Sequence, residues 1–200
     1  MTYEATDDRL LTAPIDPEAP QRMARLRALG LDTRPDQEFD EFAAKLAQIT
    51  GAPYAMVNLI TDQEQYFAGL YTPTSTKTGA ALQAAQASVH GDLGREMALD
   101  DGFCPHVVAR RKALVLDDVC DYPRFAGNPV VDKIGIRSYL GAPLIDRTGT
   151  ALGTVCVVAT EPRPWGRPGL DTIKSMAAEL VELIMKREEQ LDSSARHRFP

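Results

Sequence analysis

The stretch GFCPHVVARRKALVLDDVCDYPRFAGNPVV, residues 102–131, contains the strongest structural signal in the chain. Pro105 suits the first turn of a short helix over 105–112, where proline costs no intrahelical hydrogen bond. The segment ALVLDD, residues 113–118, predicts a strand, and the Pro, Gly and Asn residues of 119–133 predict an irregular loop. The expected order is therefore a short helix, a strand and a loop.

Two pairs of strand-like runs lie on either side of this stretch. Residues 136–145 and 151–160 flank the turn sequence DRTGT, and residues 54–60 and 65–71 are separated by a short polar segment. Short apolar runs joined in this way are typical of β-hairpins. Two hairpins predict an antiparallel sheet.

Three further helices are expected outside the strands. The first covers 18–29 and ends at Gly30, the second begins near Pro35 and ends at Gly51, and the last covers about 169–191. The apolar stripe of the second helix is Phe39, Phe42, Ala43, Leu46 and Ile49. The stripe of the last helix is Leu170, Ile173, Ala177, Leu180, Ile184 and Leu191.

These elements predict an α+β domain, in which helices flank an antiparallel sheet of five to six strands and a long C-terminal helix follows. The domain is expected to span 17–165, after a mobile N-terminal arm over 1–16 and before a C-terminal helix and tail over 166–200. Residues 72–94 contain few large apolar side chains, so they are predicted to form a mobile inserted loop.

Composition narrows the functional classes. The chain has 200 residues, 44% of them hydrophobic, which is enough for a core of its own. A net charge of -6 disfavours binding to nucleic acid or to an anionic membrane, and no apolar segment is long enough to span a bilayer. Three cysteines without zinc-ligand spacing predict no metal site. No secretion signal is recognisable, so a cytoplasmic protein with reduced thiols is expected.

The stretch 102–131 resembles the middle of bacterial GAF domains. The helix start Phe103-Cys104-Pro105-His106 and the loop over 121–129, with its Arg-Phe and Asn-Pro pairs, have counterparts in that family. The resemblance extends over roughly 25–162 and is broken by the insertion at 72–94. It implies a GAF-like sheet with a ligand pocket on one face, used for sensing a small molecule, for binding a chromophore or for dimerisation.

Six residues are candidates for ligand contact in such a pocket. They are Cys104, His106, Phe125, Asn128, Arg137 and Tyr139. One cation, amide or hydroxyl groups and aromatic walls suit a small polar or anionic ligand. Each residue also has a structural interpretation, since Phe125 can fill the core, Asn128 can cap a turn and Arg137 can be a solvated cation. No catalytic residue is assigned.

Cys104 is the most distinctive of the three thiols. With Pro105 at the first helical position, Cys104 is expected at the N-cap, where free backbone amides lower the pKa of a thiol. The alternatives are a redox or attachment site and a small buried residue. Alkylation is expected in the order Cys104, Cys120, Cys156, and a Cys104 sealed inside the pocket would exchange the first two.

The sequence assigns no cofactor. Bilin-binding GAF domains commonly have an adjacent Cys-His pair, whereas Pro105 separates Cys104 from His106. The signature of cyclic-nucleotide-binding GAF domains is not found, and an iron–sulfur cluster normally takes four cysteines. Haem bound through His90 or His106 stays open, with only a lone histidine in its favour.

Two functions from different classes stay open. The first is a small-molecule-sensing or regulatory GAF module in signal transduction, acting through a signalling protein partner and a homodimer. The helical spacing of the C-terminal stripe places that dimer on the last helix, with residues 18–29 contributing. The second is an enzyme like free methionine sulfoxide reductases, or a thiol-based redox enzyme or sensor. The cysteine motif of those reductases is not recognisable, which favours the first, non-enzymatic function.

Overall fold

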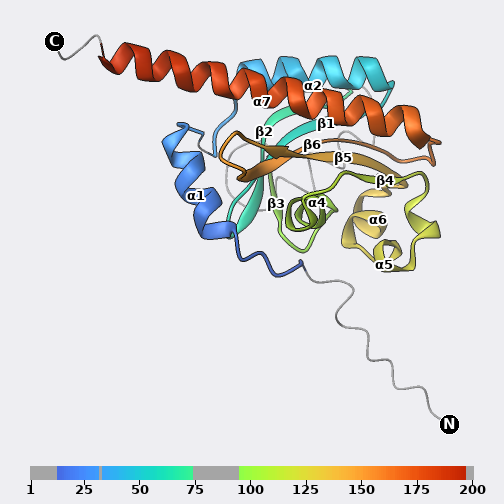
Figure 1. Cartoon of the computed structure of the whole chain (residues 1–200). Coiled ribbons are helices and arrows are strands. Elements are labelled where there is room, and N and C mark those ends of the chain that lie inside the picture. The colour runs from blue at the N-terminus through green and yellow to red at the C-terminus, as the bar shows by residue number, and fades with distance from the viewer. Residues whose placement is uncertain (1–12, 32, 74–94, 197–200) are drawn as a thin grey trace.

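The centre of the molecule is one antiparallel sheet of six strands in the order β3-β2-β1-β6-β5-β4 (Figure 1). The computed structural model describes residues 13–31, 33–73 and 95–196. The two predicted hairpins are confirmed as β1–β2 and β5–β6. The strands are β1 (Tyr54–Ile60), β2 (Glu64–Tyr71), β3 (Glu96–Ala98), β4 (Leu114–Leu116), β5 (Ser138–Ile145) and β6 (Ala151–Ala159).

Helices cover both faces of the sheet, as predicted for an α+β fold (Figure 1). Two long helices lie side by side on one face, and three short ones cover the other. A further helix lies beside the end of β1 and β6, where Arg22 donates hydrogen bonds to the carbonyl oxygens of Ile60 and Ala151. The two long helices are α2 (Gln37–Thr50) and α7 (Gly166–Arg196). The three short helices on the other face are α4 (Cys104–Arg110), α5 (Pro123–Ala126) and α6 (Pro129–Ile134). The helix beside β1 and β6 is α1 (Ala19–Ala28).

The sheet separates two apolar cores. In β6, Val155 and Val157 belong to the core under α2 and α7, whereas Cys156 and Val158 belong to the core under α4, α5 and α6. Side chains of a strand point alternately to its two faces, so one strand supplies both cores. All of β6 is buried, which explains why its sequence is largely apolar rather than alternating between apolar and polar residues.

The stripe on α7 packs inside its own chain. Ile173, Ala177, Leu180 and Ile184 are buried in the core formed with α2 and the sheet, whereas Leu191 is 56% exposed. These four side chains are therefore unavailable as a seam between two copies. The same spacing is found in a helix that packs on its own sheet, so a dimer through another face of the last helix stays a prediction.

Several local predictions need correction. The segment predicted as an irregular loop contains a short 3-10 helix and the helices α5 and α6, with Asp118 and Asn128 as side-chain caps. Strand β3 was not predicted, and Ile49, expected in the stripe of α2, is exposed. The helix α2 begins after Asp36, whose carboxylate accepts a hydrogen bond from the amide of Phe39.

Parts of two predicted segments lie outside the described residues. These parts are 1–12 of the N-terminal arm and 74–94 of the inserted loop. Within the arm, residues 13–16 are described, and the carboxylate of Asp16 pairs with the guanidinium of Arg22.

The helix α2 approaches β2 closely at one glycine. A Cβ added to Gly69 would lie 2.3 Å from the carbonyl oxygen of Phe39, which is helix backbone and cannot swing away. The substitution Gly69→Ala is therefore expected to force α2 from the sheet and to lower the free energy of unfolding by about 1–3 kcal/mol in urea titrations. Gly30→Ala is the comparison for backbone strain without a close contact, because Gly30 has a φ of +65° and nothing lies within 4 Å of that position. A loss at Gly69 no larger than that at Gly30 would contradict this packing.

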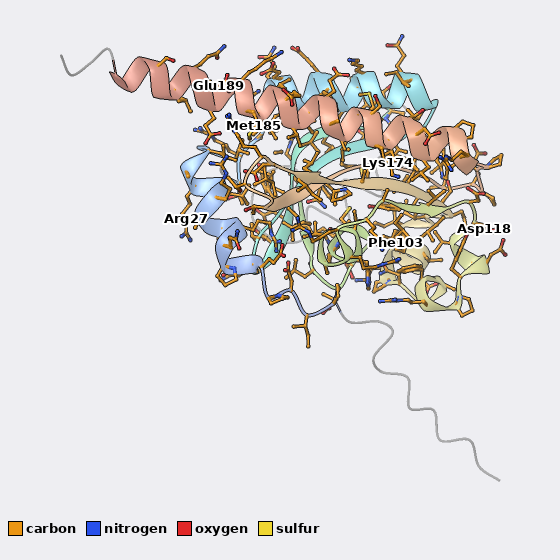
Figure 2. All side chains as sticks on the ribbon, viewed as in Figure 1. Arg27, Phe103, Asp118, Lys174, Met185 and Glu189 are labelled. Atoms are coloured by element: carbon orange, nitrogen blue, oxygen red, sulfur yellow. The ribbon has the colours of Figure 1, made fainter. Side chains whose placement is uncertain are left out.

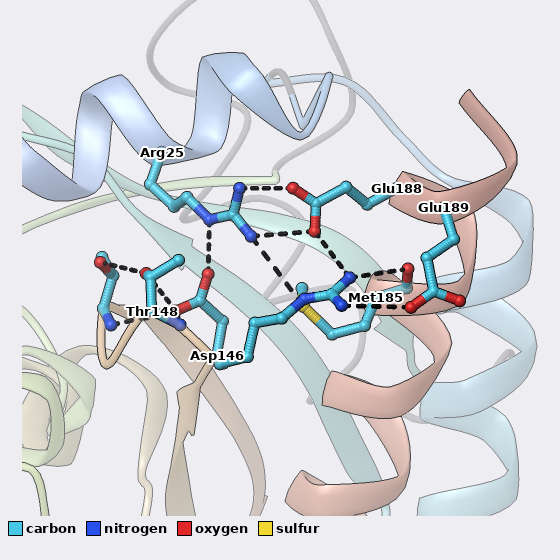
Figure 3. Close-up of polar contacts among 8 residues, drawn as sticks. Arg25, Asp146, Thr148, Met185, Glu188 and Glu189 are labelled. Carbon is cyan, nitrogen blue, oxygen red and sulfur yellow. Dashed lines mark hydrogen bonds and ion pairs between the residues drawn. The ribbon is translucent and has the colours of Figure 1, made fainter. Parts of the chain in front are cut away.

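Charged side chains tie α1 and α7 to the turn between β5 and β6 (Figure 3). The Arg25 guanidinium on α1 donates to the carboxylates of Asp146 in the turn and Glu188 on α7. Asp146 also accepts hydrogen bonds from the amides of Thr148 and Thr150. One buried carboxylate therefore holds the turn and, through Arg25, joins three distant segments.

The hydrogen bonds to Asp146 make the free energy of unfolding depend on pH. Burial raises the pKa of Asp146, but hydrogen bonds from Thr148 and Arg25 outweigh burial and hold that pKa below its ordinary value. A carboxyl whose pKa folding lowers stabilises the fold above its ordinary pKa of about 4, and this stabilisation is lost as the pH falls through the folded-state value.

Asp146→Asn is therefore expected to lower the free energy of unfolding at pH 7 by about 2 kcal/mol, the scale of hydrogen bonds to a charged group. Urea titrations at pH 7 and at about pH 3 measure the effect, and the difference from the unsubstituted chain should shrink as the pH falls, because the ionic part of the Asp146 stabilisation is lost as the pH falls toward its lowered folded-state pKa. Glu161→Gln, in an exposed ion pair with Arg163, is the control and should change little. A loss for Asp146→Asn that is equal at both pH values would refute the ionic role.

Candidate functional site

A small cavity lies between the sheet and the α4–α6 layer, and we call it the chamber. Its volume is about 40 Å³, and its lining includes Met56, Phe67, Met97, Phe103, Cys104 and Tyr139. Phe103 lies on this side of the sheet, and Lys174 of α7 lies on the opposite side (Figure 2). The chamber is thus on the face where the resemblance places a ligand pocket.

Cys104 occupies the first turn of α4 and points into this core. The N-cap is Phe103, so the expected N-cap position of Cys104 was wrong by one residue. The Cys104 Sγ lies 3.4 Å from the Tyr139 hydroxyl oxygen and 3.5 Å from the Cys156 Sγ. Both thiols are free and buried. The structure thus joins the start of a helix to the middle of β6 through two sulfur atoms.

The two thiols differ in acidity because they share a contact. The hydrogen bond with Cys156 lowers the pKa of the Cys104 thiol, although burial opposes this shift, and Thr154 and Tyr139 lower it further. The same contact, together with burial, raises the pKa of Cys156. Burial and then the charge of Cys104 raise the pKa of Tyr139, which therefore keeps its proton and can donate it in a hydrogen bond to a thiolate. Cys104 is the side of the pair that ionises first.

Aromatic rings surround Cys104 on the side facing α5. Phe103 contacts Tyr139 and Phe125 edge to face, with ring centroids 5.1 and 5.7 Å apart. His106 meets the ring of Phe125 at 5.3 Å. Burial, followed by the nearby charges of Arg124 and Arg110, lowers the pKa of His106 to about 4, so this imidazole is neutral at pH 7.

Asn128 holds the entrance to α4. Its side-chain amide donates to the carbonyl oxygen of Gly102, and its oxygen accepts from the amide of the same glycine. That oxygen also accepts from the amide of Val130, which caps α6. The polar atoms of Asn128 are therefore occupied in fixing the chamber wall, as in its structural interpretation.

Arg137 lies outside the chamber. Its guanidinium, with 39% of the side chain exposed, pairs with Asp118. Asp118 is at the edge of the molecule, beside the short helices (Figure 2). The structure thus gathers Cys104, His106, Phe125, Asn128 and Tyr139 on one side of the sheet and leaves Arg137 apart. The chamber has no cation to match the anionic form of the expected polar or anionic ligand.

Sequence reasoning missed Cys156, which was expected only to be an inert strand residue. Across β5 and β6, Tyr139 pairs with Val158, so both lie on the same face as Cys156. Alternation along β6 gives this face, but only the register of the sheet and the placement of α4 bring Cys156 against Cys104. Within the described part of the chain, no cluster of His, Cys, Asp and Glu could hold a metal ion, and no helix could cross a membrane.

The burial of the thiols changes the expected order of alkylation. Cys104 and Cys156 are buried, whereas Cys120 is exposed. Brief iodoacetamide treatment of the native chain at neutral pH is expected to label Cys120 first, because access limits the other two. In denaturant all three should react, which is the control for peptide recovery. Mass-spectrometric mapping that finds Cys156 labelled first would contradict the strand assignment.

Comparisons with known proteins agree with this geometry. The GAF domain family matches residues 34–185. A cyclic di-GMP phosphodiesterase from Pseudomonas aeruginosa is 28% identical over 187 residues, which cover 92% of this chain but only 28% of that protein.

Two solved structures share the fold with TM-scores of 0.56. One is the GAF domain of an Acinetobacter phosphoenolpyruvate-protein phosphotransferase, at 13% identity, covering 89% of this chain and 99% of that one. The other is the free methionine-R-sulfoxide reductase of Neisseria meningitidis with its substrate, at 15% identity, covering 90% and 98%. These likenesses show the fold, and the family match extends over most of the sequence. The chain therefore belongs to the GAF domain family.

Proposed function

We propose that this chain is a regulatory GAF module that senses a small molecule at the chamber and signals through α7 to a protein partner or to an attached domain. The arrangement of the two cores supports this proposal, because the chamber and α7 lie on opposite faces of the same two strands. The phosphodiesterase that matches this chain is much longer than it, which is the relation expected between a regulatory module and a multidomain signalling protein.

The strands β5 and β6 provide the physical connection. Tyr139 and Cys156 belong to the core on the chamber side of the sheet, whereas Leu140 and Val157 belong to the core shared with α7. Close-packed cores transmit a displacement because they contain little free volume. A ligand that moves Tyr139 therefore acts on the strand against which α7 packs.

The chamber limits what can bind without rearrangement. A volume of about 40 Å³ accommodates two or three water-sized molecules, so a ligand of a few heavy atoms fits. A larger ligand requires α4 or α6 to move outward. The proposed ligand is therefore small, and it is selected by apolar walls with one thiol, one hydroxyl group and the Gln65 amide rather than by a cation.

One flank of α7 is open for a partner. A surface groove of about 740 Å³ runs between α7 and β5, and it is lined by Leu170, Val181, Lys174 and Lys112. The proposed partner contact includes this flank. The homodimer expected from the α7 stripe is not part of the proposal, since the stripe is buried within the chain.

A reductase acting on free methionine sulfoxide is the second candidate. The thiol pair in the chamber and the fold shared with the Neisseria meningitidis enzyme favour it. The size of the chamber opposes it, because an amino acid with a thioether side chain is several times larger than the space beside Cys104. The regulatory function is therefore the better supported of the two.

The connection between the two faces can be tested with Gly141→Ala. A Cβ on Gly141 would lie 2.2 Å from the Tyr139 hydroxyl oxygen, so the substitution displaces the tyrosine without touching α7. Hydrogen exchange followed by mass spectrometry is expected to show faster exchange in 173–184 of α7, beyond what the overall loss of stability explains.

Gly149→Ala, in the turn between β5 and β6, is the control for general destabilisation, because its φ of +82° strains an alanine although nothing lies within 4 Å of that position. Exchange that rises in α4 and β5 alone would show that the chamber and α7 are uncoupled, and the proposed signalling route would then be abandoned.

A further inference from the structure

Two thiols from distant parts of the sequence are in contact inside this domain. The Sγ atoms of Cys104 and Cys156 are 3.5 Å apart, and both side chains are fully surrounded by protein. A disulfide bond is about 2.05 Å long, so the sulfur atoms need to approach by about 1.5 Å to form one. The contact places a second sulfur atom where it can attack the first.

Only one of the two thiols lines the chamber. Cys104 lines the chamber, whereas Cys156 lies behind it in β6. The volume of about 40 Å³ exceeds the roughly 10–15 Å³ that a water molecule needs, and it suffices for hydrogen peroxide. Glutathione disulfide and other peptide-sized oxidants are too large to reach Cys104 there.

The surroundings of Cys104 favour nucleophilic attack. The thiolate is the reactive form of cysteine, and the Cys156 contact lowers the pKa of Cys104. The Tyr139 hydroxyl, 3.4 Å from the Sγ, can donate a hydrogen bond to the thiolate. The apolar remainder of the chamber keeps bulk water from the reacting atoms.

We propose that Cys104 and Cys156 form a peroxide-reactive dithiol that closes to an intramolecular disulfide. The Cys104 thiolate attacks one peroxide oxygen, the O–O bond breaks, and the other oxygen leaves as water after taking a proton. Cys104 is then a sulfenic acid. Cys156, after giving up its proton, attacks the Cys104 sulfur, the S–O bond breaks, the S–S bond forms, and the leaving hydroxide takes that proton to become water. Two thiols and one hydrogen peroxide thus give one disulfide and two waters.

The dithiol shares the chamber with the regulatory function proposed above but does not depend on it. Its chemistry needs only the pair, the chamber and a peroxide, whether or not α7 responds. Cys156 acts as the resolving thiol, which prevents further oxidation of Cys104 to sulfinic acid. Cys120 is exposed, whereas both thiols of the pair are buried, so it provides an internal comparison.

The first test uses the full chain, reduced, freed of reductant and exposed to hydrogen peroxide. After the remaining thiols are blocked in denaturant, peptide mapping is expected to find Cys104 joined to Cys156 and separated again by a reductant. Retention of both thiols while Cys120 is oxidised would overturn the proposal. Oxygen added to Met56 or Met97 while the pair stays reduced would overturn it as well, because peroxide would then have entered without reaction.

A matched pair of variants tests the order of the steps. In Cys156→Ala the sulfenic acid on Cys104 cannot be resolved, so it should accumulate and react with dimedone, and longer exposure should give sulfinic acid. Cys120→Ala keeps the pair and should form the disulfide as the unsubstituted chain does. Equal dimedone labelling of Cys104 in the two variants would refute the resolving role. The mapping of the unsubstituted chain keeps the proposal testable if Cys156→Ala does not fold.

Tyr139 is a positioning residue in this scheme, and Tyr139→Phe removes only its hydroxyl group. The disulfide is expected to form several-fold more slowly, because the thiolate loses a hydrogen-bond donor. Tyr54→Phe is the control, since Tyr54 belongs to the same core but its hydroxyl makes no hydrogen bond to either sulfur atom. Equal rates of disulfide formation in the two variants would show that Tyr139 has no part in the mechanism. The peptide mapping of the unsubstituted chain would then decide whether the thiol pair reacts.

Discussion

The burial of β6 on both of its faces is the constraint on which the rest of the molecule depends. All its residues are buried, and its two neighbours in the sheet, β1 and β5, are largely buried as well. A strand with no solvent-facing side needs a layer of helices above and below. The long helices α2 and α7 form one layer and the short helices α4, α5 and α6 form the other, so the positions of the helices follow from this central strand.

The two buried faces differ in chemistry. The face under α7 has branched aliphatic side chains such as Val155 and Val157, whereas the opposite face has Cys156, Tyr139 and Thr154. Burying polar atoms costs stability unless they find partners, and apolar side chains would fill the same space at lower cost. The polar groups gather around Cys104, beside a cavity and under a short helix. That combination marks this face as the one where chemistry or binding takes place.

Sequence patterns predicted the elements better than their assembly. The apolar runs of β1, β2, β5 and β6 and the glycine at the end of α2 follow from local rules, and each was predicted. The spacing of the apolar stripe on α7 suits a helix that packs on its own sheet and equally a helix that packs in a dimer. Only the tertiary structure distinguishes the two. Cys104 and Cys156 are 52 residues apart, and their contact depends on strand register and on the position of α4, neither of which one sequence specifies.

The dithiol and the signalling route meet in the same strand. Closing the disulfide would draw the first turn of α4 toward β6, since the sulfur atoms must approach by about 1.5 Å. Val155 and Val157, on either side of Cys156, lie in the core beneath α7. A displacement of Cys156 would therefore shift side chains against which α7 packs. Oxidation and the binding of a small molecule would then be two inputs that reach α7 through one element. They also exclude each other, because Cys104 lines the chamber, and a molecule bound there occupies the space that a peroxide needs to reach the thiol.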